Sequence, residues 1–552
     1  MLLEFKAELI GLLSKMVEEN QLVLLKDKVN IEESKSCKFG FCFTNLPHLL
    51  SSIYKKSLEE SGQILLELFP GHPYISKVEV VGGYLNFFLR HEVIKEFFET
   101  SHKKPKIIFS LDKSQPKKKY LIEIISANPT GSLHIGHIRN GVVTDTLSNL
   151  LEYDGSHVFR SYLINDGGLQ IKELMNSLHI IYTCMVKAIP VDVSAEKLKY
   201  SDSTVRDCAE QIAKEFGHYW DLQDPEQTQK ISKFAVEYFL NLIKKEMQEL
   251  RIQVDSWDYE TQICSEGALS SLINKLKDHL YMKDQALWFK TSKFSSESDK
   301  DDVVVKSDGS LSYFGQDLIY HIYKLEFLGH NGTIINTLAA DHKGHITRME
   351  AFFRALEIPE DVVKFKMTQL SRLIIDGKKV TFSKRENILL SFKDLTEHLS
   401  IDEIRWFLSS RDEETELDIE LEKLRGKDYN NPIFYILYAH SRAVKLIDAA
   451  KLDVLDAQFS FEKLNNDASQ ELINHILSLE WQYKKAVDTL KPHILAVYLY
   501  GLAKKFHSFY ESAPILSEPE VELKLAKLAL VHLVIRIFRE FLPIFRIEPK
   551  KS

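Results

Sequence analysis

Two histidines three residues apart, His134 and His137, lie in a stretch whose residue types could hold a nucleoside triphosphate. The apolar run 120–125 before them is typical of a buried parallel strand, and a Pro/Gly turn at 129–131 follows it. A turn between a strand and a helix start offers phosphate the positive end of the helix dipole and free backbone N–H groups. After the histidines, residues recur at the spacing of one helix face: Ile138, Val142, Thr146, Leu147, Leu150 and Leu151. The pattern therefore predicts a nucleotide site at this corner.

Two glycines strengthen this prediction. Gly131 allows the tight turn, and Gly136, between the histidines, leaves room for a base or ribose to approach the backbone. The alternative is that the two histidines only cap a helix. Because the four-residue motif is short, its setting between a strand and a helix carries the interpretation.

A second segment suited to phosphate chemistry is the lysine-rich loop 376–385. When a nucleotide loses pyrophosphate, negative charge develops on the leaving group, and an ammonium group that closes over it stabilises the transition state. We expect Lys384 in this role, next to Ser383, and either Lys378 or Lys379 could reach the same phosphates. The alternative is a solvated surface loop.

The residues from His134 to His137 match the HIGH signature of class I aminoacyl-tRNA synthetases, and residues 381–384 resemble the KMSK element of that family. Thr381 and Phe382 stand where the second element has lysine and methionine. Because further similar stretches cover nearly the whole chain, their joint occurrence is more specific than any one of them. The chain resembles the arginyl-tRNA synthetases in the stretches 162–170, 304–309, 313–321, 341–345, Gln369, 402–405, 431–432 and 438–442.

The resemblance implies site residues by position. The implied ATP-binding residues are Gly131, His134, Gly136, His137, Ser383 and Lys384, of which His134, His137 and Lys384 would be catalytic. The implied arginine-binding residues are Glu123, Asn128, His137, Tyr313, Asp317 and Gln369. A guanidinium pairs bidentately with carboxylates, and lysine cannot reproduce that fork, so such a pocket could reject lysine without an editing domain. For each acid, the alternative is a surface position.

The elements that must position these residues indicate an α/β protein with three parts. We expect a small N-terminal α+β domain at 1–100, with a hairpin turning at Gly82-Gly83, and a linker at 101–119. A Rossmann-like catalytic domain with a parallel sheet is expected at 120–395, with a helical insertion at about 174–254. Strand signals nearly vanish after Asp402, which predicts an all-α C-terminal bundle at 396–552.

Composition limits the class of protein. A chain of 552 residues with 44% hydrophobic and 27% charged residues fits a multidomain globular protein. Its five cysteines show no CxxC pair, so neither a structural metal site nor a disulfide framework is indicated. The apolar stretch 528–545 is interrupted by charged residues, which favours a core helix over a membrane span. The net charge of -8 opposes a polyanionic partner, so nucleic-acid binding would depend on local lysine clusters.

The resemblance implies ATP-dependent activation of L-arginine to arginyl-adenylate and its transfer to the 3'-terminal ribose of tRNA(Arg), with Mg²⁺ accompanying ATP. It also implies an N-terminal domain that binds the tRNA elbow through Tyr84 and Asn86, and a C-terminal anticodon-binding domain. We expect a cytoplasmic monomer that does not bind membranes. Three alternatives remain open: another class I synthetase, a small HIGH-bearing nucleotidyltransferase, and a non-catalytic tRNA-binding relative. The last is raised by Thr381 and by Asn387-Ile388, where the family usually has Gly-Asn.

Overall fold

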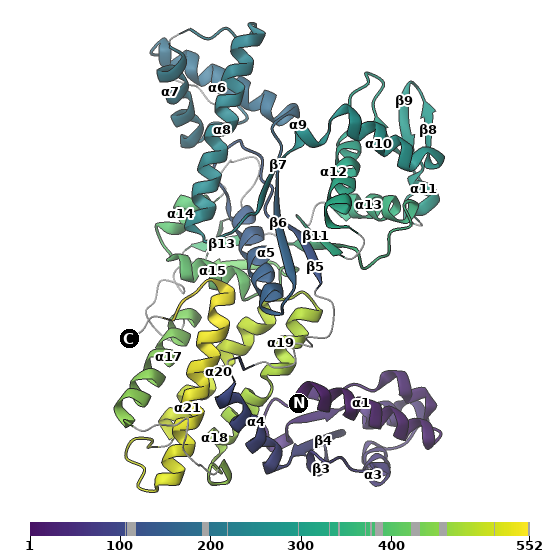
Figure 1. Ribbon diagram of the computed structural model, residues 1–552, viewed down its shortest axis with the longest axis vertical. Helices are drawn as coiled ribbons and strands as arrows, with labels where there is room; N and C mark the ends of the chain where they lie inside the picture. The colour runs from purple at the N-terminus through teal and green to yellow at the C-terminus, as the bar shows by residue number, and fades with distance from the viewer. Residues whose placement is uncertain are drawn as a thin grey trace. The chain divides into compact units, whose positions relative to one another are not determined.

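The described residues fold into two compact units (Figure 1). One lies within Met1–Ser114 and Gly426–Ser552, and the other within Gln115–Arg425. The computed structural model describes residues 1–104, 106–107, 118–189, 198–217, 219–295, 297–329, 332–339, 343–369, 371–375, 378–380, 390–420, 431–451, 461–512 and 514–549. The predicted domain boundaries stay predictions.

The unit Gln115–Arg425 is built around a five-stranded parallel sheet with the strand order β12-β11-β5-β6-β7. Its central strand is apolar and buried from Tyr120 to Ile122, as predicted. The sheet consists of β5 (Lys119–Glu123), β6 (His157–Ile164), β7 (Ser256–Tyr259), β11 (Gly332–Ala339) and β12 (Val363–Thr368). The crossover helix α5 (Ile135–Tyr153) joins β5 to β6, which confirms the predicted strand–turn–helix.

Three helices between β6 and β7 form the insertion and enclose a hydrophobic core of their own. They are α6 (Gly168–Val186), α7 (Ser203–Phe216) and α8 (Pro225–Glu249), drawn together in Figure 1. The insertion was predicted as mostly helical from about residue 174, and its first helix begins six residues earlier. Residues 190–197 of this region lie outside the described residues.

Between β7 and β11, short helices and a three-stranded antiparallel sheet, β10-β9-β8, precede a long helix, α12 (Tyr313–Leu328). Helix α12 packs on α10 and α13, so one of its sides belongs to a hydrophobic core. The other elements here are α9 (Glu260–Ile263), α10 (Glu266–Leu276), β8 (Leu280–Lys283), β9 (Ala286–Phe289), α11 (Thr291–Phe294), β10 (Asp302–Val305) and α13 (Lys343–Ala355).

The last part of this unit contains a strand that the sequence did not predict. β15 (Leu417–Glu420) pairs in parallel with β13 (Ser371–Ile375), although only helices were expected after residue 396. Four alternating apolar and acidic residues are too short a signal to indicate a strand without its partner. The neighbouring elements are β14 (Lys378–Val380), α14 (Phe392–Thr396) and α15 (Ile401–Ser409).

The N-terminal part of the other unit is a four-stranded sheet, β1-β2-β4-β3, covered by helices. Its hairpin turns at Gly82 and Gly83, both at positive φ, as the sequence predicted. A helix, α4, follows the hairpin and runs to Lys103, so it enters the predicted linker. The elements are α1 (Leu2–Glu19), β1 (Glu32–Glu33), β2 (Cys42–Thr44), α2 (Leu46–Tyr54), α3 (Leu58–Leu68), β3 (Ile75–Val81), β4 (Tyr84–Leu89) and α4 (His91–Lys103).

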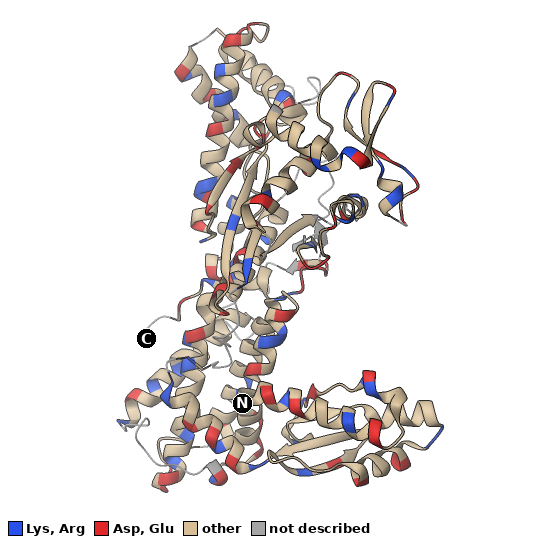
Figure 2. Cartoon of the chain, turned by 45° about the vertical axis from the view of Figure 1, so that its right-hand side comes forward, with Lys and Arg blue, Asp and Glu red and all other residues tan. Residues whose placement is uncertain are grey.

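The C-terminal part of the same unit is a helical bundle in which α21 packs on α17 and α20. The N-terminal part docks onto it: the Leu2 backbone N–H donates to Glu480, and the Trp481 indole donates to the Leu2 carbonyl oxygen. None of the helices in the described part of the chain could cross a bilayer. Basic and acidic residues are mixed along the helices (Figure 2). The bundle comprises α17 (Pro432–Ala450), α18 (Asp467–Leu477), α19 (Leu479–Asp488), α20 (His493–Ser512) and α21 (Val521–Phe541).

Candidate active site

The turn after β5 begins with two left-handed residues, Ile125 (φ 59°) and Ser126 (φ 53°). This conformation is costly for a β-branched residue, and such strain is found most often at functional sites. Side chains hold it in place: the Ile125 N–H donates to Asn140 Oδ1 (3.2 Å), and Ser126 Oγ accepts from the Leu163 N–H (3.0 Å). These hydrogen bonds therefore fix the direction in which the chain continues after the carboxyl end of β5.

A buried glutamate of the insertion holds the residues just before the histidines. Glu246 on α8 is 5% exposed and accepts from Ser132 Oγ (2.5 Å) and from the Leu133 backbone N–H (2.8 Å). Burial raises the pKa of this carboxyl, although the two hydrogen bonds oppose the rise. Sequence reasoning missed Glu246 because no local pattern indicates a contact across more than a hundred residues.

His134 caps helix α5 with its own side chain. Its Nδ1 accepts from the backbone N–H of Gly136 (3.1 Å) and of His137 (3.4 Å), so the ring proton is on Nε2. The rings of His134 and His137 stack with their centroids 3.5 Å apart. Burial lowers the pKa of His134 to about 4 and, with the repulsion of His134, that of His137 to about 3. Both imidazoles are therefore neutral near pH 7 and can offer N–H donors to phosphate.

The helix-capping alternative is thus true of His134 but leaves His137 unexplained. Within the described part of the chain, the buried Nδ1 of His137 has no hydrogen-bond partner. A buried polar atom without a hydrogen-bond partner costs stability. Such an atom is expected in a binding site whose ligand supplies the missing partner.

Two residues that follow the lysine-rich loop in the sequence, Leu390 and Phe392, lie beside the first histidine. Leu390 accepts a backbone hydrogen bond from Ile135 (2.9 Å), and Phe392 donates one to Leu133 (2.9 Å). Ser383 and Lys384, which were predicted to bind ATP, lie outside the described residues, as does 381–389 as a whole. On the other flank, β14 ends at Val380.

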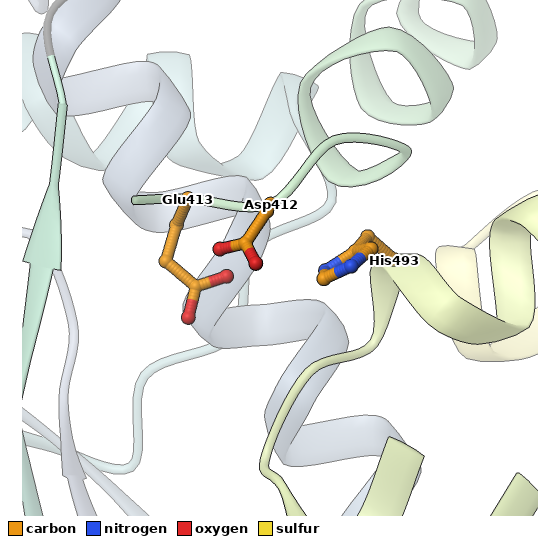
Figure 3. A group of neighbouring side chains, drawn as sticks. All are labelled: Asp412, Glu413 and His493. Carbon is orange, nitrogen blue, oxygen red and sulfur yellow. The ribbon is translucent and has the colours of Figure 1, made fainter. Parts of the chain in front are cut away.

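A fully buried arginine ties the start of α5 to the end of β12. Arg139 donates through Nη1 to the carbonyl oxygen of Gln369 (2.8 Å) and through Nη2 to those of Asp412 (3.0 Å) and Thr415 (2.9 Å). Figure 3 shows Asp412 and the adjoining Glu413 on the loop between α15 and β15; His493, also drawn there, begins α20 of the other unit. Gln369 was predicted to bind arginine, and its hydrogen bond from Arg139 holds its backbone in position.

The two carboxylates predicted to bind arginine lie close together. Glu123 ends β5 and pairs with Lys324 (2.5 Å), and Asp317 on α12 pairs with His345 Nε2 (3.2 Å). Although 37% of the Asp317 side chain is exposed, protein atoms surround its carboxyl group, and this desolvation and the charge of Glu123 raise its pKa to about 7. Tyr313, at the start of the same helix, is 63% exposed.

Asn128, predicted to bind the amino-acid head group, lies on the same turn and donates to Gln170 Oε1 of α6 (2.6 Å). The structure thus gathers Glu123, Asn128, His134 and His137 at the carboxyl end of β5, next to α12. Sequence reasoning missed Lys324 and His345. Lys324 follows Asp317 by seven residues in an apolar helix, a spacing that puts both on one face.

The residues predicted to bind tRNA belong to the hairpin of the other unit. Tyr84 is 39% exposed, and its ring packs against Phe43 and His48. Asn86 is only 3% exposed, and its amide nitrogen donates to the backbone of Tyr84 (3.1 Å). This burial favours a role for Asn86 in holding the hairpin that presents Tyr84.

Comparisons with known proteins agree along the chain. Residues 4–89 match the family described as "Arginyl tRNA synthetase N terminal domain", residues 106–402 "tRNA synthetases class I (R), catalytic domain", and residues 436–552 "DALR anticodon binding domain". The arginine–tRNA ligase of Ureaplasma parvum is 31% identical over 95% of this chain and 94% of its own length. That of Staphylococcus epidermidis is 29% identical over 92% and 91%. The arginyl-tRNA synthetase structure from Thermus thermophilus shares the fold, with a TM-score of 0.76 and 18% identity over 99% of both chains.

Proposed function

Since the chain belongs to the arginyl-tRNA synthetase family and is an aminoacyl-tRNA ligase, we propose that the turn after β5 and helix α12 hold ATP and arginine together. The enzyme activates L-arginine with ATP to arginyl-adenylate and transfers arginine to the 3'-terminal ribose of tRNA(Arg). It is therefore neither a different class I synthetase nor a small nucleotidyltransferase. We propose below which residues bind ATP and which bind arginine.

ATP, taken as its Mg²⁺ complex, binds at the corner formed by Gly131, His134, Gly136 and His137. The arginine carboxylate attacks the α-phosphate and pyrophosphate leaves, so charge grows on the leaving group while no covalent enzyme intermediate forms. Neutral imidazole N–H groups and the dipole of α5 favour that charge, and Lys384, with Ser383, contributes the ammonium group. The hydrogen bonds of Leu390 and Phe392 to residues on either side of His134 support this, because Leu390 directly follows Lys384 and its neighbours in the sequence.

Arginine binds with its guanidinium between Glu123 and Asp317, and with its head group at Asn128 and His137. Tyr313 and Gln369 complete the pocket. One observation carries this assignment: two carboxylates from different elements approach closely enough for one charge to raise the pKa of the other, directly beside the nucleotide corner. Lys324 pairs with only one of these two acids, and a planar guanidinium can bond both carboxylates at once, whereas an ammonium group cannot.

The test is aminoacylation by Asp317→Asn, with tRNA(Arg) present throughout. We expect the KM for arginine to rise about ten- to a hundredfold, because a charge-assisted bond of roughly 1.5–3 kcal/mol is lost, while the KM for ATP stays unchanged. Glu326→Gln is the matched control, since Glu326 lies on the same helix and, among the residues that the structure describes, forms an ion pair with Lys275 at the surface. An unchanged KM for arginine would remove Asp317 from the pocket.

The N-terminal domain contacts the tRNA elbow through Tyr84, and the bundle contacts the anticodon. Replacing Tyr84 with alanine is expected to raise the KM for tRNA(Arg) without changing the KM for arginine, since stacking on a base is lost. The enzyme acts as a cytoplasmic monomer without a structural metal. Light scattering, cell fractionation and elemental analysis of the purified protein test these three points.

A further inference from the structure

A buried ammonium group lies behind the two carboxylates of the proposed arginine pocket. Lys324 on α12 is 1% exposed; its Nζ donates to Glu123 Oε2 (2.5 Å) and Asn336 Oδ1 (2.7 Å) and lies 3.9 Å from the ring centroid of Tyr320. Burial lowers the pKa of Lys324, and the carboxylate of Glu123 counteracts this. A buried charge is retained only where its partners compensate for desolvation, so this arrangement holds both groups in place.

The contacts of Lys324 continue to the backbone of Asp317, the residue that carries the second carboxylate. Asn336 Nδ2 lies 3.0 Å from His321 Nε2, and His321 Nδ1 lies 2.8 Å from the backbone carbonyl oxygen of Asp317. Because an amide nitrogen only donates, His321 accepts at Nε2 and donates from Nδ1. Burial keeps the pKa of His321 well below its usual range, which agrees with a neutral ring. A chain of hydrogen bonds therefore links Glu123, Lys324, Asn336, His321 and Asp317.

Other charged groups face the ion pair of Lys324 and Glu123 from the neighbouring elements. Burial and the charges of Glu123 and Glu260 raise the pKa of Asp317, whereas Lys324 and Arg348 lower it. The groups are Asp258 of β7, Glu260 of α9, His345 and Arg348 of α13, and Asp317, Tyr320 and His321 of α12 itself. The charge of Asp258 raises the pKa of both Lys324 and Tyr320. Among the described residues, the only ammonium group bonded to Glu123 is that of Lys324.

We propose that Lys324 is a positioning residue for arginine: its ammonium group occupies one oxygen of Glu123 and thereby directs the guanidinium to the other oxygen and to Asp317. This inference rests on the proposed arginine pocket. With Lys324 present, one acid of the two, Asp317, gains a proton near neutrality. Without the positive charge of Lys324, two desolvated acids stand together, and such pairs hold a proton between them.

The difference is visible in the pH dependence of arginine binding. In the wild-type enzyme one carboxyl must lose a proton before arginine binds. The KM for arginine therefore rises about tenfold for each pH unit below 7, since one proton is linked to binding. Without the charge of Lys324 a second carboxyl must also ionise. The rise then becomes steeper, approaching about a hundredfold per unit, and extends above pH 7.

The experiment measures aminoacylation from pH 6 to 8.5 for Lys324→Gln, which keeps a hydrogen-bond donor but removes the charge, and for Lys324→Arg, which keeps the charge. We expect the steeper profile for the KM of arginine in Lys324→Gln, the wild-type slope in Lys324→Arg, and an unchanged KM for ATP in both. A purely structural role would instead lower the Tm and raise both KM values equally at every pH. Parallel profiles for wild type and Lys324→Gln would overturn the proposal.

Asn336→Asp provides a second route if Lys324→Gln does not fold. This isosteric change places a competing carboxylate on Lys324, so Glu123 loses part of its counter-charge and the profile again becomes steeper; a wild-type slope would count against the proposal. Asp317→Asn separates the inference from its premise. If Asp317→Asn leaves arginine binding intact, the pocket itself is wrong. If it weakens binding while Lys324→Gln keeps the wild-type slope, only the role of Lys324 is wrong.

Discussion

Arg405 and Asp145 form an ion pair whose two side chains have no exposed surface, with Nη2 and Oδ2 2.5 Å apart. Arg405 also donates through Nη1 to the carbonyl oxygen of Leu250 (2.7 Å), and Asp145 Oδ1 accepts from the Gln253 N–H (3.2 Å). The pair therefore fastens α15, which follows the lysine-rich loop, to the helix that begins with the histidines and to the end of the insertion.

Removing one partner of this pair should destabilise the catalytic unit strongly. We expect Arg405→Met to lower its free energy of unfolding by about 3–5 kcal/mol, because the charge of Asp145 is left buried without its counter-ion. Calorimetry can identify the transition of this unit as the one that added ATP shifts to higher temperature. Replacing both residues, as Asp145→Asn with Arg405→Met, should cost less than the sum of the single changes. Strictly additive costs would contradict the coupling.

Periodicity explains which parts of this fold can be read from the sequence. The strand at 119–123, the helix after His134 and the Gly82-Gly83 hairpin follow from local patterns, and the structure contains all three. Long-range partners cannot be read in this way. Asp145 lies in a helix whose core-facing residues resemble those of any buried helix, so nothing local indicates that Arg405, 260 positions later, neutralises it.

The residues of the candidate site also fall into two groups, those that the sequence indicates and those that it does not. Glu123, Asn128 and the histidines could be named because a short motif and a resemblance fix their positions. Glu246 and Lys324, which hold those residues, could not, since an acid or a lysine in a long helix is usually a solvated residue. Only the folded chain shows that both are buried against the site.

Glu246 provides a test of the link between the insertion and the nucleotide corner. In Glu246→Ala the Ser132 hydroxyl and the Leu133 N–H lose their acceptor, so the turn before His134 should loosen. We expect kcat/KM for ATP to fall about ten- to a hundredfold, from the loss of roughly 1.5–3 kcal/mol of hydrogen bonding to a charged group. Glu249→Ala is the control, because Glu249 lies on the same helix but is exposed. Equal kinetics in the two variants would show that Glu246 does not support the ATP site.

Gly136→Ala should separate activity from stability. A Cβ there would lie 3.1 Å from His134 Cε1 and 3.2 Å from Nδ1, and the ring cannot shift without disturbing its cap and its stack on His137. Alanine is a better helix former by about 0.5–1 kcal/mol, which offsets the cost of disturbing the cap, so the Tm should change little while kcat/KM for ATP falls about tenfold or more.

Gly11→Ala is the matched control for this change. Gly11 lies in α1 with open space where its Cβ would stand, so the Tm should rise with full activity. If Gly136→Ala also kept full activity, the close approach of that backbone to a nucleotide would be refuted.

Acid should destabilise the unit formed by the two ends of the chain, and His102 is the residue to follow. It is 7% exposed, and its Nδ1 lies 3.1 Å from Nδ1 of His532 on α21. Burial, with the repulsion of His532 and Arg536, lowers its pKa to about 3. The unfolded chain therefore takes up this proton below about pH 6.5 while the folded chain does not, so stability is lost as the pH falls from 6.5 towards 3.

Between pH 7 and pH 5 this single histidine should cost about 2 kcal/mol of the free energy of unfolding. His102→Asn removes the titrating group, so the variant should lose about that much less stability over the same interval. His91→Asn is the control, because His91 begins the same helix and is exposed. Denaturant unfolding of the full chain at the two pH values gives the comparison. If wild type and His102→Asn lost equal stability, the acid sensitivity would have to come from other histidines of this unit whose pKa values burial also lowers: His440, His475, His507 and His532.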